Sequence, residues 1–289
     1  MEEKSIQLDG KKAKYYEIQN PNAIQTAHFY GGNGFTTGVY EPLLTELSDN
    51  FTLTSLAMQG YWYDKPNAKK ITREQDADAL IAFLQATQNR PVVGIGHSQG
   101  ATATAIAAAK RPELFSQLFL LEPVTFTKRQ TMLYELAPRV LKMGQEPFKS
   151  TLAKQATWDT VADYYQFLRA HRAYKRVSDV HLMTYAKNSL QPDSKGKFEL
   201  IFSPEQELAN YFGTPFVNEA LQTLEREQKV PYTIVMGKPT MFISEDVRAS
   251  WAKFIPNERL ILWSEYGHLL PMEAPELCAD LIKQHFSKA

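Results

Sequence analysis

The sequence predicts an α/β fold in which a mostly parallel, doubly wound sheet carries a mainly helical insertion. Short, almost continuously apolar runs alternate with segments of helical periodicity, and this alternation is typical of a parallel sheet covered by helices on both faces. A long stretch of mostly helical pattern interrupts the alternation. We therefore expect residues 1–124 and 230–289 to form the sheet-containing core. Residues 125–229 should form a helical unit inserted after the strand that ends near Glu122.

In the first part of the chain, apolar or alternating segments predict strands and periodic segments predict helices. Asp9-Gly10 lies between the first two strands and is a hairpin signal. One helix begins after Thr72, with Gln75 three residues later as in a capping box. An alanine-rich helix directly follows the fifth strand and ends before Pro112. The predicted strands are residues 5–8, 13–18, 26–30, 51–57, 91–96 and 118–121, and the predicted helices are residues 39–47, 72–87 and 101–109.

The last part of the chain resumes the alternation after the insertion. Residues 232–237 and 260–263 are predicted strands, and residues 275–286 are a predicted terminal helix. The insertion itself is rich in Trp, Tyr and Phe, which favours an apolar binding pocket.

Composition excludes several classes of protein. The 289 residues include 32 Lys and Arg against 32 Asp and Glu, so the formal charge is zero. A nucleic-acid binder or a polybasic membrane anchor should show a basic excess. The single cysteine, Cys278, rules out an internal disulfide framework and a cysteine-rich zinc site. No apolar run follows the first residues, so we do not expect them to form a signal peptide. The least polar stretch, residues 91–109, is interrupted by His97, Ser98 and Gln99, so we do not expect it to span a membrane. We therefore expect a soluble, cytoplasmic protein without stable membrane association.

The segment Gly96-His97-Ser98-Gln99-Gly100 fits the pattern G-x-S-x-G between a buried strand and a helix. A sharp turn at this place holds the serine in a strained conformation, and the flanking glycines let strand and helix approach closely. The serine hydroxyl then lies at a helix amino terminus, where developing negative charge is favoured. These observations make Ser98 the candidate nucleophile.

A serine nucleophile needs a base that accepts its proton, and His268 is the best placed of the six histidines. It follows the last predicted strand and precedes the terminal helix. In a doubly wound sheet this loop lies at the carboxyl ends of the strands, which is also the edge of Ser98. The other histidines fall in a strand, next to the serine, in the insertion or on the terminal helix. These are His28, His97, His171, His181 and His285.

The chain resembles the α/β-hydrolase superfamily, and within it the esterase-like serine hydrolases with a helical cap domain. The resemblance is carried by the strand–GHSQG–helix unit, by the glycine-rich loop at residues 30–35, and by Gly267-His268 before the terminal helix. It implies that the insertion is the cap and that the backbone N–H groups of Asn33 and Gln99 bind the oxyanion. Gly31 stands where the family's loop usually has a histidine.

The acid of a Ser-His-acid triad is missing from the family's usual place. The aligned positions are Thr240 and Met241, neither of which carries a charge. Glu122 ends the strand after the nucleophile at the same edge of the sheet, where some family members, including the haloalkane dehalogenases, place their acid. Glu245 or Asp246 could serve instead if their loop folds back. A dyad, or a water or threonine in place of the acid, is the remaining alternative.

A serine nucleophile favours acyl transfer and argues against the aspartate-based dehalogenase and epoxide-hydrolase chemistries of the family. Hydrolysis of a carboxylic ester with an apolar group is the leading expectation, with amide, thioester and carbon–carbon hydrolysis open. The alternative is a catalytically impaired small-molecule binding protein on the same scaffold. We expect a small-molecule substrate, no cofactor and no metal, while the oligomeric state stays open. The expected pocket residues are Gly32, Phe35, Trp62 and Tyr165.

Overall fold

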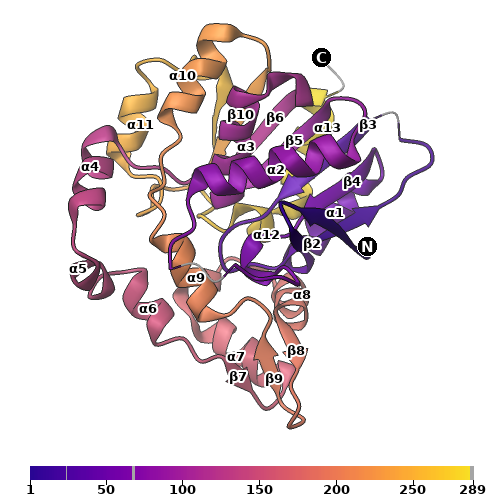
Figure 1. The fold of residues 1–289 in the computed structure, drawn as a ribbon, viewed down its shortest axis with the longest axis vertical. Coiled ribbons are helices and arrows are strands. Elements are labelled where there is room, and N and C mark those ends of the chain that lie inside the picture. Colours follow the sequence, from indigo (N-terminus) through magenta and orange to yellow (C-terminus); the bar gives the residue numbers. More distant parts are fainter. Residues whose placement is uncertain (24, 67–68, 287–289) are drawn as a thin grey trace.

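The computed structural model describes residues 1–23, 25–66 and 69–286, which form a sheet covered by helices and an insertion beyond one end of the sheet (Figure 1). Within these residues the main sheet has eight strands in the order β1-β2-β4-β3-β5-β6-β10-β11. The pairs β1–β2 and β2–β4 are antiparallel, and all other neighbours are parallel. The strands are β1 (Glu2–Leu8), β2 (Lys11–Ile18), β3 (Gln25–Tyr30), β4 (Phe51–Leu56), β5 (Val92–His97), β6 (Phe115–Leu121), β10 (Tyr232–Met236) and β11 (Leu260–Leu262).

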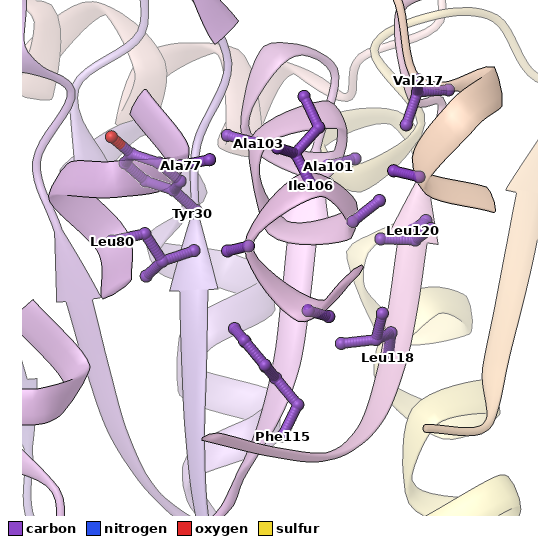
Figure 2. Packing of buried hydrophobic residues seen from close by; sticks show 14 of the residues in the cluster. Tyr30, Ala77, Leu80, Ala101, Ala103, Ile106, Phe115, Leu118, Leu120 and Val217 are labelled. Atoms are coloured by element: carbon purple, nitrogen blue, oxygen red, sulfur yellow. The ribbon is translucent and has the colours of Figure 1, made fainter. Parts of the chain in front are cut away.

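Helices cover both faces of this sheet. α2 and α10 pack against α3 on one face, where α11 also contributes to the core, and α1 packs against α13 on the other. The alanine-rich α3 packs closely between the sheet and the neighbouring helices because its alanines, such as Ala101 and Ala103, are small and fully buried (Figure 2). These helices are α1 (Glu41–Ser48), α2 (Arg73–Thr87), α3 (Gln99–Lys110), α10 (Asn218–Glu227), α11 (Glu245–Trp251) and α13 (Pro275–Phe286).

The predicted α/β class is confirmed, and several elements match closely. The terminal helix α13 has the predicted bounds. The capping box also forms: the Thr72 hydroxyl accepts the backbone N–H of Gln75, and the Gln75 side chain accepts that of Thr72. The central strand β5 begins one residue later and ends one residue later than predicted, running directly into the turn at Ser98.

The insertion is largely helical, as expected, but it also contains a small antiparallel sheet in the order β7-β9-β8. The sequence did not indicate these strands because two or three residues are too few to show an alternating pattern. The elements are α4 (Lys128–Leu136), α5 (Arg139–Met143), α6 (Phe148–Leu152), β7 (Thr157–Trp158), α7 (Val161–Ala170), α8 (Asp179–Ser189), β8 (Leu190–Pro192), β9 (Phe198–Leu200) and α9 (Pro204–Tyr211).

The contacts of the insertion suggest narrower bounds than the predicted 125–229. Its two stems run side by side, since the backbone N–H of Phe126 donates to the carbonyl of Pro215 at 3.1 Å. Beyond these stems, α10 packs on α3 and belongs to the layer that covers the sheet. We therefore propose residues 127–214 as the inserted unit and call them the cap. Among the described residues, no helix has both the length and the apolar character needed to cross a bilayer.

Candidate active site

Ser98 occupies a sharp turn between the central strand β5 and helix α3. Its backbone angles, φ 55° and ψ −120°, lie in a region that residues with a Cβ atom rarely adopt. The flanking glycines leave room for this turn. A Cβ atom at Gly96 would lie 2.5 Å from the Cα atom of Ala101, and one at Gly100 would lie 2.1 Å from the carbonyl oxygen of Tyr30. The motif therefore folds as the strand–turn–helix unit that its sequence context indicated.

Replacing Gly100 with alanine is expected to lower the free energy of unfolding by about 3 kcal/mol or more, because the added methyl group meets backbone atoms that cannot rotate away. Urea unfolding measures this change. Gly144→Ala is the matched control, since its Cβ atom would lie 3.7 Å from its nearest neighbour, the carbonyl oxygen of Leu141. Equal stability of the two variants would contradict the close approach of α3 to β3.

The side chains of Ser98, His268 and Glu122 form one hydrogen-bonded chain. His268 Nδ1 lies 3.0 Å from Glu122 Oε2, and His268 Nε2 lies 3.0 Å from Ser98 Oγ. A carboxylate accepts hydrogen bonds, so Nδ1 carries the proton and Nε2 is left to accept the serine hydroxyl. The ring of Phe242 stacks on the imidazole with centroids 4.4 Å apart, which helps to fix its plane.

Glu122 is held rigidly at the end of β6. It is fully buried, its φ is 52°, and its backbone N–H donates to the carbonyl of Val235 at 2.8 Å. One carboxylate oxygen accepts the backbone N–H of Gly237 and the other faces His268. The carboxylate therefore has two fixed donors, and its position is set by the pairing of β6 with β10.

The other predicted acids lie elsewhere. Glu245 and Asp246 are exposed in the first turn of α11, and neither is hydrogen-bonded to His268 in the described part of the chain. Thr240, at the family's usual acid position, instead accepts the backbone N–H groups of Phe242 and Ile243 in a local turn. The loop therefore leads into α11 without turning a carboxylate toward the imidazole.

The glycine-rich loop after β3 passes directly against Ser98. A Cβ atom at Gly32 would lie 3.1 Å from the Cβ atom of Ser98, so a side chain there would displace the loop. The next residue, Asn33, donates from its side-chain amide to the carbonyl of Glu207 in α9 at 3.0 Å. Its backbone N–H has no acceptor among the described residues.

The side chain of Gln99 is fixed in the same way. Its amide nitrogen donates to Asp76 Oδ2 in α2 and to Asn210 Oδ1 in α9, both at 2.6 Å. Within the described residues its backbone N–H, at the start of α3, also has no acceptor. Asn33 and Gln99 thus keep the two N–H groups that the resemblance assigns to the oxyanion, and their oxyanion role stays a prediction.

A cavity of about 860 Å³ opens beside Ser98 and His268, between the sheet edge and the cap. Phe35, one of the expected pocket residues, lines this cavity. Much of its wall is apolar or aromatic, and both the core and the cap contribute. Examples of these lining residues are Val124, Phe126, Leu133, Phe148, Phe242 and Leu269.

Three predicted pocket residues, Gly32, Trp62 and Tyr165, do not line this cavity. Trp62 is buried in the hydrophobic core, and its indole N–H donates to the carbonyl of Ala57. The turn that precedes it directs the side chain inward instead of toward the cavity. Tyr165 lies on α7 and donates its hydroxyl hydrogen to Asp179, away from the cavity wall. Gly32 contributes no side chain but sets the approach of its loop to Ser98.

The profile of proteins with the alpha/beta hydrolase fold matches residues 29–275, which is most of the chain and includes Ser98, Glu122 and His268. The chain belongs to the α/β-hydrolase family. This α/β hydrolase is 28% identical over 255 residues to the 2-(acetamidomethylene)succinate hydrolase of Mesorhizobium japonicum, covering 88% of this chain and 85% of that protein. It is 23% identical over 282 residues to the uncharacterized hydrolase YugF of Bacillus subtilis, covering 95% and 94%.

Solved structures show the same fold. The crystal structure of E-2-(acetamidomethylene)succinate hydrolase superposes with a TM-score of 0.79 at 17% identity and covers 99% of this chain and 98% of that one. The match spans both the core and the cap of this α/β hydrolase.

Sequence reasoning missed several polar residues of the α/β hydrolase's cavity. Four of them come from α2, from the cap loop after α6 and from α9, and no local ligand-binding motif surrounds any of these. Only their convergence beside Ser98 marks them. These residues are Arg73, Lys154, Glu207 and Asn210.

His97 joins the two loops that flank the serine, although it points away from Ser98. A carbonyl only accepts, so His97 Nε2 donates to the carbonyl of His268, 2.8 Å away. Its Nδ1 then accepts the hydroxyl of Tyr40 at 2.8 Å, and that hydroxyl accepts the backbone N–H of Gly32. A neutral His97 thereby ties the glycine-rich loop to the loop of His268.

Acidification is expected to destabilise the α/β hydrolase through this buried imidazole. Burial lowers the pKa of His97 to about 3 from its ordinary 6.5. The unfolded chain binds a proton near pH 6.5 and the folded chain does not, so stability is lost as the pH falls below about 6.5. Between pH 7 and pH 5 this one group should remove about 2 kcal/mol.

Urea unfolding at the two pH values measures this effect. His97→Gln should lose about 2 kcal/mol less on acidification than the wild type does. His171→Gln, at an exposed histidine, is the control and should keep the wild-type dependence. An unchanged dependence in His97→Gln would show that burial does not lower the pKa of His97 in the folded protein.

Proposed function

We propose that this chain is a serine hydrolase that cleaves a carboxylic ester with an apolar group by acyl transfer. The observation that carries the proposal is the hydrogen-bonded chain from Ser98 Oγ through His268 to Glu122, at 3.0 Å on each side of the imidazole. A buried carboxylate, an oriented imidazole and a strained serine at a helix amino terminus are the parts that nucleophilic acyl transfer requires.

Each residue has a defined task in this proposal. Ser98 attacks the carbonyl carbon while His268 Nε2 takes its proton, and the backbone N–H groups of Asn33 and Gln99 stabilise the oxyanion. The protonated imidazole then gives the proton to the leaving alcohol, which departs as the acyl-enzyme forms. Water repeats the sequence to release the acid and restore the serine. Glu122 stabilises the imidazolium in both halves.

The apolar part of the cavity wall supports the apolar group of the substrate. Aromatic side chains such as Phe126, Phe148 and Phe242 line a volume that accommodates a small organic molecule. The name of the Mesorhizobium relative contains an acetamide group. Amide cleavage is therefore the second bond type to include in any substrate panel.

A fluorophosphonate probe tests the proposal directly, because it labels only a serine that is activated as a nucleophile. We expect one label per chain, located on Ser98 by peptide mass spectrometry. Nitrophenyl esters of increasing acyl length should be hydrolysed, and matched anilides would reveal amide cleavage. A folded protein that neither takes the label nor hydrolyses any ester would instead be a binding protein on a hydrolase scaffold.

A further inference from the structure

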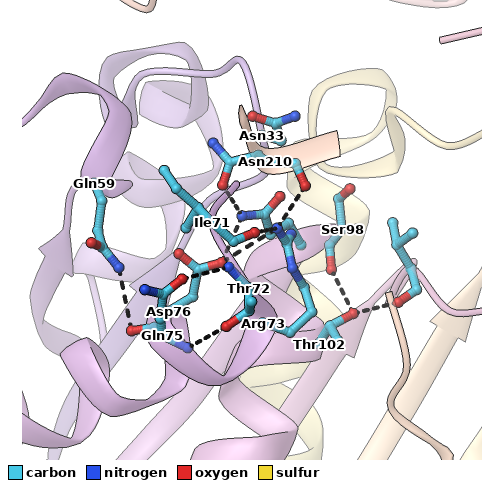
Figure 3. Close-up of polar contacts among 12 residues, drawn as sticks. Asn33, Gln59, Ile71, Thr72, Arg73, Gln75, Asp76, Ser98, Thr102 and Asn210 are labelled. Carbon is cyan, nitrogen blue, oxygen red and sulfur yellow. Dashed lines mark hydrogen bonds and ion pairs between the residues drawn. The ribbon is translucent and has the colours of Figure 1, made fainter. Parts of the chain in front are cut away.

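A buried arginine forms part of the cavity wall next to the proposed nucleophile. Arg73 begins α2, is 3% exposed, and lines the same cavity as Ser98. Two hydrogen bonds through Asn210 connect Arg73 to the turn that carries Ser98. Arg73 Nη2 donates to the carbonyl of Asn210 at 3.0 Å (Figure 3). The Asn210 side chain in turn accepts the amide of Gln99, which follows Ser98.

The guanidinium of Arg73 uses only one of its nitrogens. Nη2 donates to the carbonyls of Ile71 and Asn210, at 3.3 and 3.0 Å. Within the described residues, Nε is fully buried with no hydrogen-bond partner, whereas Nη1 is not fully buried and donates to no protein acceptor. Buried charged donors are almost always satisfied, so the unpaired Nη1 of an arginine in a cavity wall indicates a ligand that accepts from it.

The charge of Arg73 is also incompletely balanced. Its nearest carboxylate, Asp76, lies 3.7 Å from Nη2 through Oδ2, an oxygen that also accepts the amide of Gln99, while Oδ1 has no partner among the described residues. Burial raises the pKa of Asp76 to about 7, so this carboxyl is partly protonated at neutral pH. It then compensates the arginine only in part.

The other charges on the cavity wall do not supply the missing acceptor. Lys154 and Glu207 form an ion pair with each other at 2.8 Å. A carboxylate oxygen of Glu146 accepts the backbone N–H of Ser150. A further cation, Lys142, lines the cavity with its ammonium over the ring of Tyr134. None of these carboxylates accepts a hydrogen bond from Arg73 in the described part of the chain, so its unpaired Nη1 is left for a ligand.

We propose that Arg73 binds a carboxylate of the substrate, so that the preferred ester carries an anionic group as well as an apolar one. Nη1 keeps its N–H donors, and the positive charge of the guanidinium strengthens a hydrogen bond from them to a carboxylate oxygen. This inference rests on the proposed ester hydrolysis for its kinetic test, but the carboxylate site itself can be measured by binding. A purely structural arginine, which only fastens α9 to α2, would show no preference for an anion.

The kinetic test compares two esters of equal shape, the mono-nitrophenyl ester of adipic acid and the same ester of adipic acid monoamide. We expect the wild type to favour the acid over the amide at least about tenfold in kcat/KM. Arg73→Met should abolish this ratio, and Arg73→Lys should restore part of it. Arg129→Met, at an exposed arginine on α4, is the control and should keep the wild-type ratio.

The binding test uses adipate and the neutral adipamide with the wild-type protein in isothermal calorimetry. Adipate should bind at least about tenfold more tightly, and Arg73→Lys should retain part of this difference. This readout needs neither hydrolysis nor a folded Arg73→Met variant. It therefore separates failure of the anion site from failure of the ester hydrolase.

Two results would overturn the inference. One is equal affinity of the wild type for adipate and adipamide. The other is a ratio of kcat/KM for the acid ester to kcat/KM for the amide ester that is the same in the wild type and Arg73→Met. This result includes the case in which the variant loses activity on both esters equally. If adipate binds as expected but no ester is cleaved and Ser98 takes no label, the carboxylate site stands and the proposed hydrolysis fails.

Discussion

Replacing Ser98 with alanine is expected to lower kcat/KM for ester hydrolysis by about four to six orders of magnitude. The change removes the only hydroxyl that is hydrogen-bonded to His268 in the described part of the chain. It leaves the cavity and the oxyanion N–H groups in place, so a small residual rate and substrate binding should remain. Steady-state kinetics on the preferred nitrophenyl ester measures the loss, and the fluorophosphonate label should disappear with it.

Ser116→Ala is the matched control for this experiment. Ser116 is an exposed serine near the start of β6, at the opposite end of the strand from Glu122. It should keep wild-type kinetics and labelling. Hydrolysis that persists at more than about one hundredth of the wild-type rate in Ser98→Ala would show that another group attacks the ester.

Glu122→Gln is expected to lower kcat by about two to four orders of magnitude while changing stability little. The glutamine oxygen can still accept the N–H of Gly237, but its amide group donates toward His268 Nδ1. The imidazole then carries its proton on Nε2, where it cannot accept the hydroxyl of Ser98. The loss should appear in kcat more than in KM, because ground-state binding does not use this tautomer.

Asp246→Asn provides the comparison, because it removes a carboxylate that lies exposed on α11. We expect it to keep nearly the wild-type rate. If Asp246→Asn were the more damaging change, the loop after β10 would have to refold toward His268 during the reaction. Glu122 would then not be the acid.

The position of Glu122 has a physical explanation in the sheet. β6 and β10 are adjacent parallel strands, with Leu121 paired to Val235, so their carboxyl ends meet at one edge. An acid that follows either strand can reach the same imidazole. Here the loop after β10 forms a turn through Thr240, and the carboxylate is supplied one strand earlier.

Much of the site's outline can be predicted from the sequence because its signals are local. The elbow around Ser98 needs glycines at two fixed offsets, between a buried strand and a helix, and these appear as a continuous motif. His268 is identified by its place after the last strand, since all loops at that edge converge. The fold class follows in the same way from the alternation of apolar strands and periodic helices.

The sequence left the acid open among Glu122, Glu245 and Asp246, with a dyad, or a water or threonine in place of the acid, as a further alternative. It also placed Trp62 at the pocket, where the structure buries it in the core. In both cases the outcome depends on the direction in which a loop turns its side chains, and direction is set by packing against distant residues. Periodicity within a segment carries no information about such contacts.

The sequence by itself thus determined the scaffold, the serine and the histidine of this α/β hydrolase. The tertiary structure alone decided which carboxylate faces the imidazole and that α9 holds the side chains of both Asn33 and Gln99. It also decided that Arg73, a buried arginine with unpaired donors, lines the cavity. The reason is physical: a strand or an elbow is built from neighbours in the chain, whereas burial, charge balance and unpaired donors arise only when distant segments pack together.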